Sequence, residues 1–262
     1  MNKPDLHIEF LGTGTSLGVP MIGCSCKVCK SENPKDNRLR ASIVINYNNK
    51  NVVIDCGPDF RTQLLRAHIN DLEAVLITHE HRDHIAGLDD IRSINYILRK
   101  SVDVFLAKAS LEAVKVEFPY IFQPGDYKGA PQINFKTLSN APFKLIGLEF
   151  IPLEVDHRNM KVFGFRIGDF SYITDANHIP EKTMKLLEGT KTLVINALRI
   201  KKHPTHFNLE EAINIAQIIK AKQTYFTHLG HLIGKHDEVN AQLPEGMALA
   251  HDGLKIKQKY NS

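Results

Sequence analysis

The chain has 262 residues, which suits one large domain or two small ones and is enough for a sizeable buried core. Hydrophobic residues make up 43% and charged residues 24%, as in an ordinary soluble globular protein. Lysine and arginine exceed aspartate and glutamate by only 33 to 29, which permits an anionic small substrate and does not by itself indicate an extended nucleic-acid surface.

The first predicted elements are a strand at 6–11 and a Gly-rich turn at 12–20 that lacks the Gly-Lys-Ser/Thr of a phosphate-binding loop. A hairpin at 42–47 and 51–55, a helix at 60–68 and a buried strand at 74–78 follow. The N-terminal residues form no apolar stretch of signal-peptide length, and no apolar run approaches membrane-spanning length. We therefore expect a cytoplasmic protein with reduced cysteines and no membrane partner.

The remaining segments alternate between helix and strand patterns. They are a helix at 88–99, a strand at 102–107, a helix at 111–116, a loop at 124–131, strands at 132–138, 148–155, 162–167 and 170–174, a helix at 180–187 with Pro180 at its first position, a strand at 192–196, a helix at 208–220, a strand at 223–227, and a short helix and two short strands. Asn208 and Glu211 resemble a capping box. No linker or clear internal repeat is visible, so one domain over 1–262 is expected.

The strongest chemical signal is the motif His79-Glu80-His81-Arg82-Asp83-His84, which directly follows the buried strand at 74–78. The strand would deliver three imidazoles and a carboxylate into a loop at its carboxyl end. Imidazole and carboxylate together suit zinc, manganese or iron. A solvated, His-rich polar loop is the alternative, but this spacing arises rarely by chance. We therefore predict a metal site here.

A second signal is the triplet Cys24-Ser25-Cys26-Lys27-Val28-Cys29. Three thiolates within six residues can wrap one zinc ion, and a tetrahedral site needs one more ligand. Cys56 is the last cysteine, but it follows an apolar strand and could equally be a buried thiol. An exposed cluster of free thiols is the alternative, although it would oxidise easily.

Further candidate ligands come just after predicted strands: His157, Asp175 and His228. Each alone is typical of a cap or turn residue. Together with the 79–84 motif, in this order, they resemble the metallo-β-lactamase superfamily over almost the whole chain. The resemblance implies an αββα sandwich with a two-metal site at one edge. It also implies the ligand sets, with Asp175 bridging the two metals: His79, His81 and His157 for one, and Asp83, His84 and His228 for the other.

The stretch 12–29 resembles, more narrowly, the N-terminal signature of PhnP-type phosphodiesterases, which hydrolyse phosphoribosyl 1,2-cyclic phosphate. This resemblance implies His231 as the fourth ligand of a structural zinc, bound by a loop at about 20–31, and leaves Cys56 in the core. It also implies that His206 is the general acid for the leaving alkoxide. A solvated loop histidine is the alternative for His206. Asp83 and His206 are thus the candidate catalytic residues.

The predicted function is a metal-dependent phosphodiesterase. Two active-site cations (zinc or manganese, with iron as a further candidate) would hold a bridging hydroxide that attacks a small cyclic or nucleotide-like diester. One structural zinc is expected in addition. The expected partner is this small anionic substrate and not nucleic acid, and the family suggests a homodimer.

Two alternatives have other functions. A tRNA 3′-end nuclease of the same superfamily would need a protruding Gly- and Lys-rich arm, which we do not find in the sequence. A non-hydrolytic protein resembling pyrroloquinoline quinone biosynthesis protein B would share the cysteine triplet but depart from the full set of active-site ligands.

Overall fold

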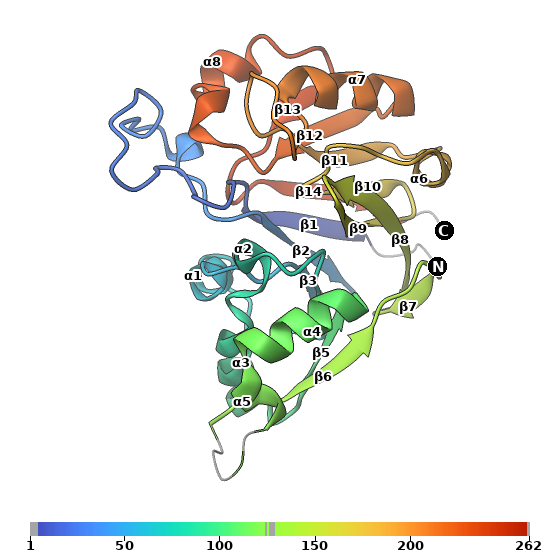
Figure 1. Ribbon diagram of the computed structural model, residues 1–262. Helices are drawn as coiled ribbons and strands as arrows, with labels where there is room; N and C mark the ends of the chain where they lie inside the picture. Colours follow the sequence, from blue (N-terminus) through green and yellow to red (C-terminus); the bar gives the residue numbers. More distant parts are fainter. Residues whose placement is uncertain (1–4, 124, 126–128, 261–262) are drawn as a thin grey trace.

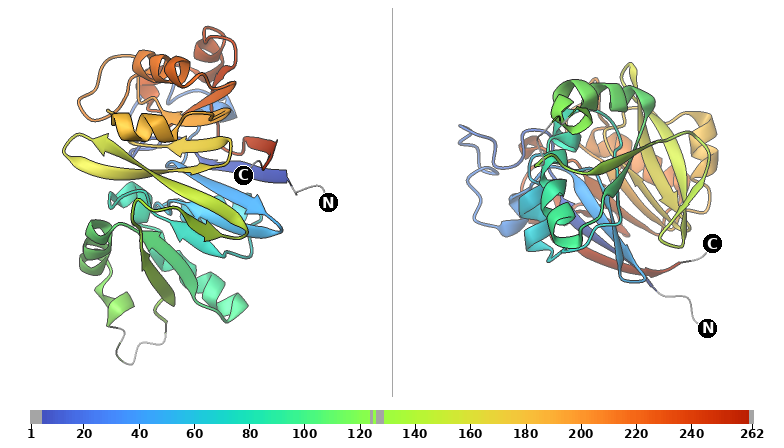
Figure 2. Two further views of the ribbon diagram at one scale, coloured as in Figure 1. Left: turned by 90° about the vertical axis from the view of Figure 1, so that its right-hand side faces the viewer. Right: turned by 90° about the horizontal axis from the view of Figure 1, so that it is seen from below.

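The structure is a computed structural model that describes residues 5–260 apart from 124 and 126–128. Two seven-stranded sheets pack face to face, and helices lie on their outer sides (Figures 1 and 2). This is the predicted αββα sandwich. Within the described residues, no helix combines the length and the apolar character needed to cross a membrane.

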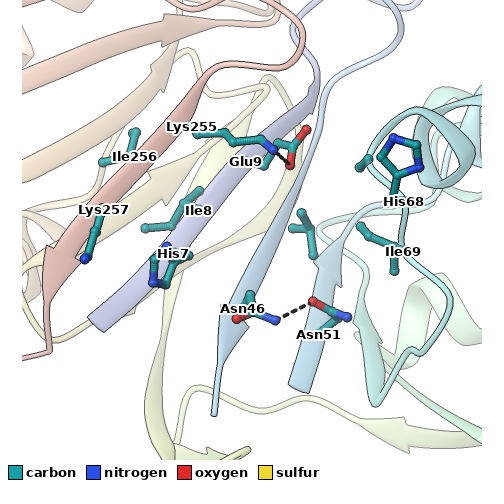
Figure 3. A pocket seen from close by; sticks show the side chains of 12 residues that line it. His7, Ile8, Glu9, Asn46, Asn51, His68, Ile69, Lys255, Ile256 and Lys257 are labelled. Atoms are coloured by element: carbon teal, nitrogen blue, oxygen red, sulfur yellow. Dashed lines mark hydrogen bonds and ion pairs between the residues drawn. The ribbon is translucent and has the colours of Figure 1, made fainter. Parts of the chain in front are cut away.

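The first sheet has the strand order β14-β1-β2-β3-β4-β5-β6. Its strands are β1 (Asp5–Gly12), β2 (Ser42–Tyr47), β3 (Lys50–Ile54), β4 (Ala74–Leu76), β5 (Val102–Leu106), β6 (Ile133–Thr137) and β14 (Lys255–Lys259). Neighbours from β14 to β3 are antiparallel, and those from β3 to β6 are parallel. Asn46 of β2 donates a side-chain hydrogen bond to Asn51 of β3 across one antiparallel pair (Figure 3). The helices of this half of the chain are α1 (Phe60–Arg66), α2 (Arg82–Ile85), α3 (Ile91–Leu98), α4 (Lys108–Glu117) and α5 (Pro119–Phe122).

The second sheet has the order β13-β12-β11-β10-β9-β8-β7. Its strands are β7 (Phe143–Leu145), β8 (Leu148–His157), β9 (Met160–Ile167), β10 (Phe170–Ile173), β11 (Thr192–Asn196), β12 (Gln223–Thr227) and β13 (Met247–Leu249). The helices α6 (Glu181–Leu186), α7 (Leu209–Ile219) and α8 (His236–Asn240) belong to this half. Both halves run from antiparallel to parallel pairing, so they share a topology although the sequence shows no clear repeat.

Three apolar cores hold the layers together. The largest lies between the two sheets and takes alternate residues of each strand, such as Ile8 and Phe10 of β1 and Phe163 and Phe165 of β9. The other two lie between each sheet and its helices. Successive side chains of a strand point to opposite faces of the sheet, so each strand contributes one face to the core between the sheets and the other to the core under the helices. This explains why nearly every strand residue near the middle of the sheets is apolar and buried.

The structure differs from the predicted elements in local details. The short elements α2, α5 and β7 were not predicted; the residues of α2 were expected in a loop. The predicted helix at 88–99 begins with a 3₁₀ turn (Leu88–Asp90) before α3. Pro180 is the N-cap of α6 and not its first helical residue, so that prediction was wrong by one position. The capping box of Asn208 and Glu211 is confirmed. The loop predicted at 124–131 falls partly on residues outside the described part of the chain.

Candidate metal centre

The His79–His84 motif forms the turn between β4 and α2 and the first residues of that helix. His79 and His84 are fully buried, whereas His81 is exposed, so the cluster opens to solvent on one side. A Cβ atom on Gly57 would lie 2.0 Å from the carbonyl oxygen of Asp83. Glycine at this position therefore lets the segment after β3 pack directly against the motif.

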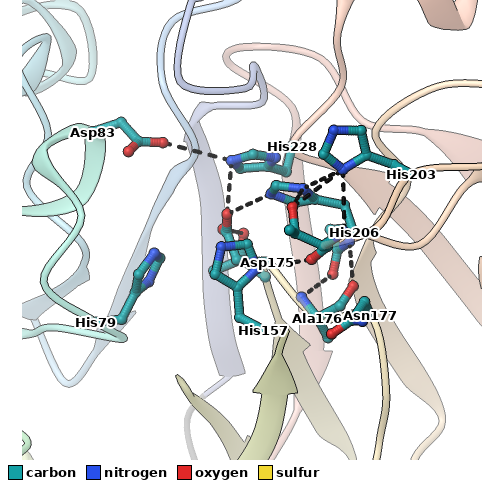
Figure 4. A network of polar contacts seen from close by, with 12 residues as sticks. His79, Asp83, His157, Asp175, Ala176, Asn177, His203, His206 and His228 are labelled. Atoms are coloured by element: carbon teal, nitrogen blue, oxygen red, sulfur yellow. Dashed lines mark hydrogen bonds and ion pairs between the residues drawn. The ribbon is translucent and has the colours of Figure 1, made fainter. Parts of the chain in front are cut away.

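The structure brings all seven side chains of the predicted active-site set together. Figure 4 shows His79, Asp83, His157, Asp175 and His228 of this set. Their ligand atoms form overlapping groups, in each of which the atoms lie within 4.8 Å of one another: His79, His81 and His157; His79, His84 and Asp175; and Asp83, His84 and His228. The carboxylate of Asp175 lies 3.3 Å from His84 Nε2 and 3.1 Å from His228 Nε2. It therefore occupies the space between the two predicted ligand sets. Which of these atoms bind metal stays a prediction.

Two of these side chains are oriented by residues that adopt a left-handed backbone conformation just after a strand. Asp175 and His228 follow β10 and β12 with φ angles of 57° and 54°, a conformation that non-glycine residues seldom adopt. Such strained residues persist where the surrounding structure determines them, and they gather at functional sites.

One buried carboxylate that we did not predict orients two of the imidazoles. Asp55, which follows β3, accepts hydrogen bonds from His84 Nδ1 at 2.7 Å and from Thr78 Oγ1 at 2.9 Å. Because Thr78 donates its hydroxyl proton to Asp55, its oxygen can accept the Nδ1 proton of His79 at 3.0 Å. Asp55 therefore fixes the tautomers of both histidines, and an aspartate after a strand is too common in sequence to signal this role.

The buried nitrogens of the cluster fit divalent metal ions. His157 donates its Nδ1 proton to Thr205 O at 2.8 Å, so the neutral forms of His79, His84 and His157 have their lone pair on Nε2. The buried atoms His79 Nε2 and His228 Nδ1 have no hydrogen-bond or ion-pair partner among the described residues, whereas the Nε2 atoms of His84 and His228 face the carboxylate of Asp175. An unsatisfied buried polar atom costs about 1–3 kcal/mol, and a cation would remove that cost.

The charges of the cluster also suit a cation. Burial would lower the pKa of His84, but the carboxylates of Asp55, Asp83 and Asp175 outweigh it and raise the pKa well above its usual value. Burial would raise the pKa of Asp175, yet His228 and His84 hold it well below its usual range. Burial lowers the pKa of His79. The cluster thus combines ionised carboxylates with a neutral imidazole, which are the forms that bind metals.

His206, the predicted general acid, lies at the same cluster (Figure 4). Its Nε2 atom lies 3.0 Å from Asp175 Oδ1, and with His157 and Asp175 it forms a further group that could hold an ion. Burial lowers the pKa of His206 to about 4, although the hydrogen bond to Asp175 opposes this shift. The structure thus places His206 among the reacting groups, and its role as acid stays a prediction.

The second predicted site, on the N-terminal loop, is also assembled. The Sγ atoms of Cys24, Cys26 and Cys29 lie 3.3, 3.4 and 3.5 Å from His231 Nδ1. A tetrahedral zinc with usual bond lengths separates sulfur and nitrogen ligands by about 3.6 Å, so the four side chains fit one zinc ion. Cys56 is fully buried in the core beneath the helices of the first sheet, away from this group.

Replacing Asp55 by asparagine is expected to weaken metal binding or lower kcat/KM by roughly 10–100-fold. The amide Nδ2 must face at least one of the three donors from Thr78 and His84, so the network loses an acceptor. Metal content by mass spectrometry and turnover of a phosphodiester would measure the effect. Asp103→Asn, on strand β5 between β4 and β6, is the matched control, and equal losses in both variants would contradict the role of Asp55.

A model of the family described as beta-lactamase superfamily domain matches residues 50–229. An octanoyltransferase from Porphyromonas gingivalis is 37% identical over 94% of this chain, but the chain spans only 50% of that relative's length. A solved structure of a diphosphatase from the PhnP family is 41% identical, with a TM-score of 0.92 over 98% of both chains. Zinc-bound PqqB from Methylobacterium extorquens has a TM-score of 0.78 at 20% identity, covering 95% of this chain and 99% of its own, and supports the fold alone.

Proposed function

The chain belongs to the beta-lactamase superfamily and is PhnP-like, and from this premise we propose that it is a metal-dependent phosphodiesterase acting on a small anionic substrate. One observation carries the proposal: seven ligand-type side chains converge on one cluster, and buried imidazole nitrogens there have no hydrogen-bond partner among the described residues. The substrate is a cyclic or nucleotide-like diester, or a substituted diphosphate like that implied by the diphosphatase relative.

The residues of the cluster form two ligand sets, each of which would hold one cation. His79, His81 and His157 would hold one, Asp83, His84 and His228 the other, and Asp175 would contact both. When bound, the cations would activate water and neutralise charge on the phosphoryl oxygens. Asp55 and Thr205 O hold the Nδ1 protons of the surrounding imidazoles, so that the ligand atoms are preorganised before any ion arrives.

His206 is proposed to supply a proton to the leaving oxygen. Because Asp175 can only accept, the 3.0 Å contact places the proton of His206 on Nε2, facing the cluster. To act as the acid, His206 must be the imidazolium, whose Nδ1 proton the hydroxyl oxygen of Thr205 can accept at 2.8 Å. The negative charge of a bound phosphodiester would raise the pKa of His206 from about 4, and transfer of the Nε2 proton to the leaving oxygen would leave the neutral ring.

Octanoyl transfer is not proposed for this chain. The chain matches only half of the relative that carries this name. The side chains that the fold gathers are imidazoles and carboxylates around a polar cluster, a set that is typical of metal-assisted hydrolysis. Fold similarity alone would not decide between the two activities.

A substrate panel tests the proposal. Protein loaded with Zn²⁺ or Mn²⁺ is expected to hydrolyse bis(p-nitrophenyl) phosphate, a cyclic phosphodiester or a disubstituted diphosphate, and the exposed ligand variant His81→Ala is expected to lose this activity. Full turnover by His81→Ala, or no hydrolysis of any panel member by loaded wild-type protein, would refute it. Tight, salt-sensitive binding and cleavage of precursor tRNA would instead favour the nuclease.

A further inference from the structure

Asn177 bridges two loops that reach the metal cluster from different parts of the second sheet (Figure 4). Its side-chain oxygen accepts a hydrogen bond from Arg158 N at 2.7 Å, and its Nδ2 donates to Pro204 O at 3.2 Å. Its own backbone N–H donates to Asp156 O at 2.9 Å. The side chain is half-buried, so these bonds tie the two loops together at the rim of the site.

Each of the two loops carries one histidine of the cluster. His157 ends β8 and directly precedes Arg158, and His206 lies two residues after Pro204. Among the described residues, no backbone–backbone hydrogen bond joins 156–158 to 203–206. Their hydrogen-bonded connections are the amide of Asn177 and the bond from His157 Nδ1 to Thr205 O, and the rings of His157 and His206 also meet edge to face.

We propose that Asn177 is a positioning residue, which sets the spacing between the predicted metal ligand His157 and the predicted proton donor His206. The activity part of this inference rests on the proposed function. Catalytic groups must be held within about 0.5 Å of their working geometry, and exposed loops do not reach this precision without cross-links. The residue before Asn177 is held by other hydrogen bonds. Ala176 exchanges two with the side chain of Asn196 and accepts one from Phe207 N.

The chemistry of the bridge explains why an amide stands here. One end must accept from a backbone N–H and the other must donate to a backbone carbonyl, and asparagine does both at this length. Aspartate would keep the acceptor for Arg158 N but would place an oxygen against Pro204 O. Alanine would remove both bonds, yet the freed groups lie in exposed or half-exposed loops where water can solvate them. The fold should therefore survive either change.

The test compares Asn177→Ala and Asn177→Asp with Asn134→Ala. Asn134 is an exposed asparagine on β6 whose side chain also makes two hydrogen bonds, to Ser101 and Asp103. The readouts are the rate at which Zn²⁺-loaded protein loses metal to a chelator, and kcat and KM on the best panel substrate. For Asn177→Ala we expect metal loss from the histidine cluster about tenfold faster, kcat about tenfold lower and KM within about twofold of wild type.

Release of the zinc expected at the cysteine site serves as an internal control and should not change in any variant. Asn177→Asp should fall between wild type and Asn177→Ala in metal retention. Wild-type release rates and kcat in Asn177→Ala, or equal changes in Asn134→Ala, would overturn the inference. If the wild-type protein hydrolyses no phosphodiester, the proposed function fails, but the release rates still decide the role of Asn177.

Discussion

Replacing Asp175 by asparagine is expected to lower kcat/KM for bis(p-nitrophenyl) phosphate by roughly 10³-fold, which corresponds to about 4 kcal/mol of transition-state stabilisation. Asp175 is the carboxylate that lies between the two groups of ligand atoms, 3.3 Å from His84 Nε2 and 3.1 Å from His228 Nε2. Asparagine keeps the shape but removes the negative charge. Both predicted metal positions would lose a shared anionic ligand. The effect should therefore exceed that of changing Asp55, which contacts Thr78 and His84 but belongs to neither predicted ligand set.

Metal content must be measured beside the kinetics of Asp175→Asn. We expect the variant to hold less than two active-site equivalents at metal concentrations that saturate the wild type, while the cysteine site stays filled. Asp103→Asn should leave both the metal content and kcat/KM unchanged within about twofold. A variant of Asp175 with wild-type metal content and kcat/KM within about threefold of wild type would show that this carboxylate does not bridge the ions.

The sequence predicts those parts of the site that are local. The His79–His84 motif is one continuous segment that directly follows a strand. It can therefore be recognised without knowing the fold. Asp175 and His228 carry no such signal alone, and only the family resemblance joined them to the motif. The fold explains why they meet: β10 and β12 flank β11 in a parallel run, so their carboxyl ends lie at the same edge of the second sheet.

The roles that sequence could not reveal depend on contacts across long separations. Asp55 acts on Thr78 and His84, which lie 23 and 29 residues further along the chain, through hydrogen bonds that only the paired strands β3 and β4 create. The same holds for Asn177, which reaches Pro204 27 residues away. The missed strand β7 is three residues long and exists only through its pairing with β8, so its sequence has little periodicity to detect.

Cys26→Ser is expected to remove one equivalent of bound zinc and to lower the free energy of unfolding by roughly 3 kcal/mol, or the Tm by about 5–10 °C. The loop that carries the cysteines projects from the body of the protein (Figure 1). The polar side-chain contacts that join residues 20–32 to the body of the protein are the ion pair of Lys27 with Glu238 and the group around His231. An exposed ion pair contributes at most about 1 kcal/mol, so a bound zinc would be the main cross-link.

Loss of this cross-link should also disturb the position of His228 in the candidate active site, because His228 and His231 lie on one short segment after β12. The backbone of Leu229 between them bonds to Thr13 O and accepts from Thr15 N at the base of the loop. We therefore expect kcat to fall about three- to tenfold in Cys26→Ser and trypsin to cut the loop at Lys27 or Lys30. Cys56→Ala should keep the zinc equivalent, since Cys56 is buried in the core. Full zinc content in Cys26→Ser, or a loop that stays resistant to trypsin, would mean that the thiols do not bind the ion that holds this segment beside His228.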